Sequence, residues 1–94
     1  MSVAQVAVGT SATVIAAKNY KRIELMIDNT SGSTVYIGDS NSVTTSSGVR
    51  LLNGERFQVS YQGDLHQFFY RGDIYGISDS TANVRVLELD EVRA

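Results

Sequence analysis

The sequence predicts an all-β fold, an antiparallel β-sandwich or jelly-roll-like barrel of about eight short strands. Apolar residues recur at every second position along much of the chain, and the periodicity of an amphipathic helix is almost absent. Connections rich in Gly, Asn, Asp and Ser separate these runs at intervals of roughly 8–12 residues. Because 94 residues suffice for only one core, we expect a single domain over 1–94.

Residues 22–28 show the alternation most clearly. Ile23, Leu25 and Ile27 share one face, which we expect to be buried. The charged residues of the segment share the opposite, solvent-facing side: Arg22, Glu24 and Asp28. The same criteria predict further strands around Val35 and Ile37 and over 3–8, 11–17, 56–61 (Phe57, Val59 and Tyr61 inward), 68–71, 73–78 and 82–89.

Three connections are interpreted from turn chemistry. Asn53-Gly54 is predicted to form a type I′ hairpin turn between 49–52 and 55–61, because this turn needs positive φ at both central residues. Residues 29–32, Asn-Thr-Ser-Gly, fit a tight loop. Residues 40–47 form the longest polar loop, which is either a mobile tip or a contact loop that orders on a partner.

The last predicted strand contains a change of phase. Val84 and Val86 share one face, whereas Leu87 and Leu89 lie in the opposite phase. A β-bulge between 86 and 87 explains this pattern. A strand end that leaves its own core and packs on a neighbour explains it equally well.

The composition argues against several function classes. A net charge of −2 without a basic run is unsuited to nucleic-acid binding, which needs a positive stripe. The absence of cysteine excludes disulfides and thiolate metal sites, and a single histidine, His66, gives no zinc constellation. We therefore expect no cofactor. Self-association or docking onto a partner is the reinforcement left to so small a domain.

The first 17 residues are fairly apolar, but no basic residue precedes them and polar residues interrupt them. No run approaches the length of a membrane span. The sequence thus predicts a soluble protein without a secretion signal.

Catalysis finds no support in the residue pattern, so we expect that the protein is not an enzyme. One histidine gives no nucleophile–base arrangement to test, and the carboxylates lie beside turns or on polar faces. The segment 39–41, Asp-Ser-Asn, does not continue into the spacing of a calcium loop. Arg71-Gly72-Asp73 spells the tripeptide that integrins read, but we interpret it as a turn.

The aromatic residues near 70 suggest an exposed patch. Successive strand side chains point to opposite faces, so Phe68 and Tyr70 directed inward leave Phe69 outward. Tyr75 joins Phe69 across the predicted hairpin. An outward aromatic pair is an interface patch or a platform for sugar rings, and we favour the interface.

Several short segments occur in a characteristic order. In chain order they are Lys21-Arg22 before a strand ending at Asp28-Asn29, then Val35-Tyr36-Ile37-Gly38, Val43-Thr44-Thr45, Gly48-Val49-Arg50-Leu51, Gly54-Glu55 and Val84-Arg85-Val86-Leu87-Glu88. This order resembles small β-sandwich virion structural proteins of tailed bacteriophages, which include head decoration (cement) proteins and related head or tail accessory proteins. The resemblance spans residues 5–89.

The resemblance implies a capsid decoration or cement protein that binds the outer capsid as a homo-oligomer, often a trimer, and stabilises it. The implied partners are further copies of the chain and the major capsid protein lattice, with no nucleic acid and no membrane. Its location would be the capsid exterior of the virion, after assembly in the host cytoplasm, and the mild acidity agrees with an exterior position. Head decoration, head–tail junction and tail positions all use similar sandwiches.

The interface is expected at the outward aromatics, the out-of-phase leucines and an N-terminal arm or edge strand over 1–8: Phe69, Tyr75, Leu87, Leu89, Val3 and Val6. The alternative is a small carbohydrate- or receptor-binding module of a phage tail or fibre. Its ligand face would be Tyr36, the 40–47 loop, Phe69 and Tyr75.

Overall fold

The computed structural model describes residues 2–60 and 70–90 of the chain. These residues form eight β-strands and no helix. The strands are β1 (Ser2–Val8), β2 (Thr13–Ala16), β3 (Arg22–Asn29), β4 (Val35–Gly38), β5 (Val49–Leu51), β6 (Arg56–Ser60), β7 (Ile74–Ser78) and β8 (Ala82–Asp90).

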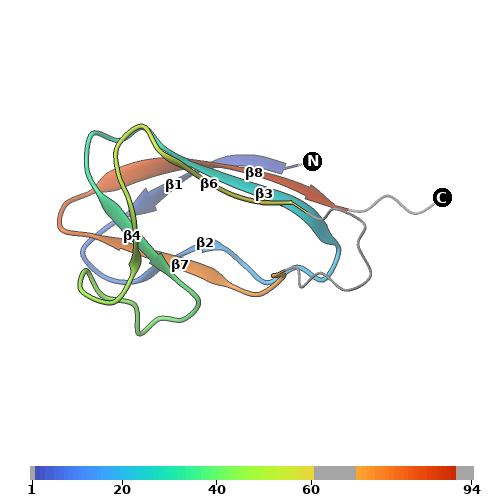
Figure 1. The fold of residues 1–94 in the computed structure, drawn as a ribbon, viewed down its shortest axis with the longest axis horizontal. Coiled ribbons are helices and arrows are strands. Elements are labelled where there is room, and N and C mark those ends of the chain that lie inside the picture. Colours follow the sequence, from blue (N-terminus) through green and yellow to red (C-terminus); the bar gives the residue numbers. More distant parts are fainter. Residues whose placement is uncertain (1, 61–69, 91–94) are drawn as a thin grey trace.

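The strands form two four-stranded antiparallel sheets, of order β1-β8-β3-β6 and β2-β7-β4-β5. We call them the β8 sheet and the β7 sheet. Figure 1 shows them as two layers, with β1, β3, β6 and β8 in the upper one. Consecutive strands alternate between the sheets except for β4 and β5, which is the order of a jelly roll. The predicted all-β sandwich is confirmed, and residues 2–8 form an edge strand.

The core lies between the sheets, and both contribute to it. The apolar side chains with no accessible surface are Val8, Leu25, Ile27, Val35, Ala82 and Val84. Leu25 and Ile27 are buried as the alternation predicts. Phe57 and Tyr70 are partly buried and pack against this cluster, and Tyr61 lies outside the described residues.

The start of β3 departs from the predicted pattern. Arg22 is fully buried, and Ile23 is only partly buried. The pairing of β3 with β8 shifts register between Arg22 and Glu24. Such an irregularity changes the phase of the strand, so Arg22 turns towards the interior. The prediction that Arg22 lies on the solvent-facing side is therefore wrong.

The predicted hairpin at Asn53-Gly54 is also wrong, because β5 and β6 belong to different sheets. The Leu52 carbonyl accepts a hydrogen bond from the Glu55 N–H at 3.0 Å, and Gly54 has a φ of 89°. No described residue other than glycine has a positive φ, so this turn is of type II, which needs positive φ only at its third residue. Type II turns splay their flanking strands, and the chain crosses to the other sheet.

Asn29 joins this corner to the preceding one. Its side chain is fully buried, and Nδ2 donates to the carbonyls of Ser33 at 2.7 Å and Leu51 at 2.8 Å. Its Oδ1 accepts hydrogen bonds from the backbone N–H and the hydroxyl of Ser31. The 29–32 segment is thus a tight loop, and it connects the two sheets.

β8 runs without a bulge along its whole pairing with β1. Val84 and Val86 face the core, and Glu88 continues the same inward phase. The bulge predicted between 86 and 87 is therefore wrong, and the irregularity lies in β3. Leu87 and Leu89 point away from the core, as the alternative interpretation of the strand end requires.

The 40–47 loop packs against β4. Val43 is 8% exposed, and the Gly48 N–H donates to the Thr44 carbonyl at 2.9 Å. A Cβ atom on Gly48 would lie 2.7 Å from the Tyr36 Cβ, so only glycine allows this close approach. The loop is folded around a buried valine.

Candidate interaction surface

The outer face of the β8 sheet carries a row of apolar side chains across three strands. Val3 of β1 lies opposite Leu87 of β8, and Leu87 lies opposite Met26 of β3. Leu89 occupies the next outward position along β8, opposite Glu24. Val3 is 68% exposed, and the other three apolar residues are partly exposed. We call Val3, Met26, Leu87 and Leu89 the Leu87 stripe.

Charged residues border the Leu87 stripe. In the next row Gln5 pairs with Arg85, Arg85 with Asp28, and Asp28 with Arg56. Arg56 donates from Nε and Nη2 to the carboxylate of Asp28. This hydrogen bond, with the charges of Arg56 and Arg85, lowers the pKa of Asp28. An apolar centre with a charged rim is the usual anatomy of a protein–protein interface.

Glu88 explains why Leu87 and Leu89 face outward. Its carboxylate occupies an inward position of β8, where Oε2 accepts a hydrogen bond from Arg22 Nε at 2.6 Å. Because side chains alternate along a strand, the residues on either side of Glu88 must project from the opposite face. An ion pair inside the sandwich thus places two leucines on its surface.

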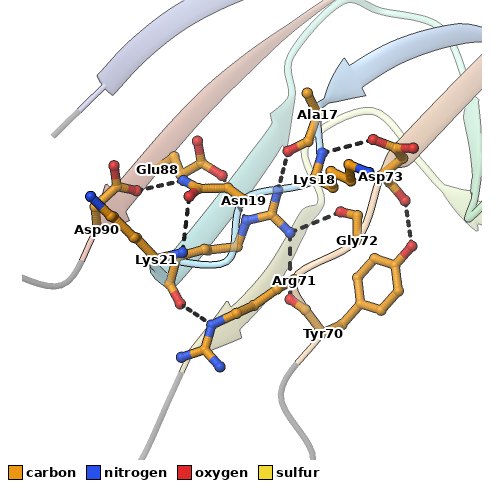
Figure 2. A network of polar contacts seen from close by, with 11 residues as sticks. Ala17, Lys18, Asn19, Lys21, Tyr70, Arg71, Gly72, Asp73, Glu88 and Asp90 are labelled. Atoms are coloured by element: carbon orange, nitrogen blue, oxygen red, sulfur yellow. Dashed lines mark hydrogen bonds and ion pairs between the residues drawn. The ribbon is translucent and has the colours of Figure 1, made fainter.

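Arg22 closes this end of the sandwich. Its side chain has no accessible surface, and besides Glu88 it contacts the nearby Ala17 and the distant 70–72 segment. Nη2 donates to the Ala17 carbonyl at 2.8 Å, and Nη1 donates to the carbonyls of Gly72 at 3.1 Å and Tyr70 at 3.4 Å. Figure 2 labels these three accepting residues. Among the described residues no buried side-chain nitrogen or oxygen lacks a hydrogen-bond partner.

The Arg71-Gly72-Asp73 tripeptide belongs to the same network. Arg71 Nε donates to the Arg22 carbonyl at 2.9 Å, and Asp73 Oδ1 accepts from the Lys18 N–H at 2.7 Å. The Tyr70 hydroxyl donates to the Asp73 carbonyl at 2.6 Å (Figure 2). All three residues are partly buried. The chain bends at Gly72, and these contacts hold the tripeptide against the end of the sandwich.

The structure separates the residues predicted for the interface. Three of them share the Leu87 stripe: Val3, Leu87 and Leu89. Val6 lies on the inward face of β1 and packs against the core, so it does not contribute to this surface. Tyr75 lies in the other sheet, and Phe69 lies outside the described residues.

Met26 is the member of the stripe that sequence reasoning missed. It stands between Leu25 and Ile27, which are both buried, so the alternation directs it outward. An apolar residue in the polar phase of a strand is the signal that identifies it.

A second apolar group lies on the outer face of the β7 sheet. Val14 pairs with Tyr75, and Tyr36 pairs with Ile77. Val14 is 41% exposed, and the other three are partly exposed. The two tyrosines expected in a ligand face therefore lie on neighbouring strands and on the same side of the sheet.

An apolar hollow of ≈ 240 Å³ lies between the two sheets at the β5 side. Its lining consists of Ile37, Gly38, Asp39, Val49, Phe57, Tyr70 and Ile74. Burial is the main cause that raises the pKa of the Tyr70 hydroxyl. Within residues 2–60 and 70–90, no three His, Cys, Asp or Glu side chains are grouped so that they could hold a metal ion.

The described residues thus define a small jelly-roll β-sandwich with an apolar group on each outer face. No protein-family model, curated protein or solved structure matches the chain. In the part of the chain that the structure describes, no helix is long and apolar enough to cross a membrane.

Proposed function

We propose that the protein is a structural virion protein of a tailed bacteriophage, a decoration or cement subunit that binds the outer capsid as a homo-oligomer. The observation that carries the proposal is the Leu87 stripe, an apolar row on the outer face of one sheet that runs to its edge strand. The capsid is proposed as the partner because the order of the sequence motifs resembles that of such virion proteins.

The stripe suits binding between protein surfaces. At roughly 25 cal/mol per Å², covering the remaining exposed area stabilises the contact most at Val3, which is 68% exposed, and less at the three partly exposed side chains. The Asp28–Arg56 pair and Arg85 beside the stripe would lie at the rim, where charges set orientation more than affinity. Such a contact could clamp neighbouring capsid subunits.

The topology agrees with this role. Jelly rolls form the domains of many viral capsid proteins, and they also form lectin domains. Because one fold hosts many functions, the topology supports both candidate functions, and the surfaces must distinguish between them.

The test is co-sedimentation of the full chain with phage capsids that lack it, together with its mass in solution. We expect an oligomer that binds the capsids. Leu87→Lys should abolish binding, whereas the control Leu52→Lys should retain it, because Leu52 is 41% exposed and lies outside the stripe. Far-UV circular dichroism would show that both variants fold. A folded wild-type monomer that stays in the supernatant contradicts the proposal.

The second candidate is a carbohydrate- or receptor-binding module, which the tyrosines of the β7 sheet favour. Aromatic rings on a flat sheet face can stack on sugar rings. Binding of the full chain to a glycan array, lost in Tyr75→Ala and kept in Leu87→Lys, would support this function. This second function would be excluded if the wild-type chain gave no signal on the glycan array and Tyr75→Ala bound capsids normally.

A further inference from the structure

Within residues 2–60 and 70–90 the two sheets have four edge strands, and three of these are protected against pairing with another chain. β5 has three residues and carries Arg50, and β2 has four residues and an irregular register. β6 begins with Arg56, which pairs with Asp28. Short length, irregularity and charge are the devices by which sheet proteins protect their edges.

β1 has none of these devices. Its seven residues, Ser-Val-Ala-Gln-Val-Ala-Val, include no charge and no proline, and they pair with β8 in an unbroken register. Among the described strands β8 is its only partner, so the other side of β1 presents backbone N–H and C=O groups for pairing. The side chains of Val3, Ala4, Gln5 and Ala7 are exposed. A long, regular, uncharged edge of this kind favours strand addition.

We propose that β1 pairs with β1 of a second copy of the chain, antiparallel and about a two-fold axis at Gln5. This inference rests on the proposed self-association and specifies its geometry. In this register Val3 lies opposite Ala7 of the second copy, Ala4 lies opposite Val6, and Gln5 lies opposite Gln5. All seven residues of β1 are paired, and the two β8 sheets join into one continuous sheet.

A second copy fits this edge for electrostatic and geometric reasons. A neutral strand that opposes itself places no like charges together. The nearest charged residue of the outer row, Arg85, is separated from its counterpart by two β1 strands, about 14 Å at the usual strand spacing. That distance exceeds the Debye length of about 8 Å at physiological salt. A two-fold axis normal to the sheet also keeps both Leu87 stripes on the same face.

The proposed contact yields a dimer, or a larger assembly with an even number of subunits. It therefore differs from the trimer that the resemblance implies. The contact surface is isologous, so any substitution at Gln5 meets itself across the axis. This property supplies the test.

The test introduces a charge of either sign at Gln5 in the full chain. Gln5→Lys and Gln5→Glu should each raise the dimer dissociation constant at least about tenfold, because like charges face each other. An equimolar mixture should recover dimers as Lys–Glu pairs, which also shows that both variants are folded. Gln58→Lys and Gln58→Glu are the matched controls, since Gln58 is exposed on the other edge strand of the same sheet, and they should leave the mass unchanged.

Single cysteine variants locate the axis, because the chain has no cysteine of its own. With oxidised glutathione as the oxidant, Gln5→Cys should give disulfide-linked dimers fastest, and Val3→Cys, Ala7→Cys and Gln58→Cys more slowly. Fastest cross-linking at Val3 or Ala7 would overturn the register.

The remaining outcomes separate this inference from the proposed function. A wild-type monomer that binds capsids overturns the strand pairing and leaves the capsid role intact. A wild-type oligomer that Gln5→Lys does not dissociate also overturns the strand pairing and leaves the capsid role intact. A dimer that Gln5→Lys dissociates, but that does not bind capsids, supports the pairing and contradicts the virion role.

Discussion

Replacing Arg22 with methionine tests whether the buried guanidinium holds the two sheets together at one end of the sandwich. Methionine fills similar space but donates no hydrogen bond. The change leaves the Glu88 carboxylate without its partner, and the carbonyls of Ala17, Tyr70 and Gly72 lose their donor.

Removing one partner of a buried ion pair costs about 3–5 kcal/mol. The Glu88 side chain is 20% exposed, so water recovers part of its solvation, and we expect a loss near the lower limit, about 3 kcal/mol. Small domains unfold with about 5–15 kcal/mol in total. The variant should therefore lose a large fraction of its stability, and its Tm should fall by about 12–24 °C.

The assay is urea unfolding followed by far-UV circular dichroism, which suits a chain without tryptophan. Arg50→Met is the matched control, because Arg50 is exposed on β5, and it should change the free energy of unfolding by no more than about 0.5 kcal/mol. Glu88→Gln and the double variant complete a double-mutant cycle, in which the double variant should lose less than the sum of the single losses. If Arg22→Met costs no more than Arg50→Met, the guanidinium does not hold the sheets and the reasoning is refuted.

Three further predictions concern other parts of the sandwich. Asn29→Asp keeps the shape of the side chain but removes the amide that donates to Ser33 and Leu51, so the free energy of unfolding should fall by roughly 2–5 kcal/mol; a urea midpoint equal to that of the wild type would contradict this. Gly76→Ala should destabilise by about 1–3 kcal/mol, because the new Cβ overlaps Ile15 Cδ1. Adding Ile15→Val, which removes that atom, should restore part of the loss in the same assay, and no recovery would argue against the overlap. The folded-state pKa of Asp28 is lowered by Arg56, so its contribution to stability is present above its unfolded pKa of about 4 and is lost as pH falls through the folded pKa. Asp28→Asn should therefore reduce the slope of stability against pH below about pH 4, measured by urea unfolding at several pH values, and an unchanged slope would assign that dependence to other groups.

The strands are the part of the fold that alternation specifies. Period-two patterning predicts which side chains face inward, because the apolar residues of a half-buried strand share one face. The structure buries four of them accordingly: Leu25, Ile27, Val84 and Val86. The strand order does not follow from it, because adjacent segments can pair as hairpins or cross between sheets. At Gly54 the sequence Asn-Gly suits both a type I′ and a type II turn, and the choice depends on the buried Asn29, which joins the two corners from 25 residues away in the chain.

The candidate site was predictable in part. Leu87 and Leu89 stand out because they break the phase of their strand, and Val3 because it lies near the end of an uncharged strand. Their proximity to Met26 depends on β3 and β1 flanking β8, a long-range arrangement that local patterning does not contain. Arg22 was assigned to the solvent-facing side because an arginine is almost never fully buried without a partner, and its partner, Glu88, lies 66 residues away.

The Arg22–Glu88 pair connects the interior of the sandwich to its surface. An apolar residue at the inward position 88 would bury area at less cost in desolvation, since buried ion pairs often contribute little net stability. An apolar residue at position 88 would also make residues 86–89 a continuous apolar run. The inward and outward faces of this part of β8 would then no longer differ in polarity. A one-residue slip of a strand exchanges its faces, and such slips are opposed only where one face is chemically distinct. Because the inward position holds a carboxylate that pairs with the buried Arg22, Leu87 and Leu89 are fixed on the outer face. The leucines that break the alternation in the sequence therefore face outward as a consequence of how the core closes, beside β1, the unprotected edge strand among the described strands.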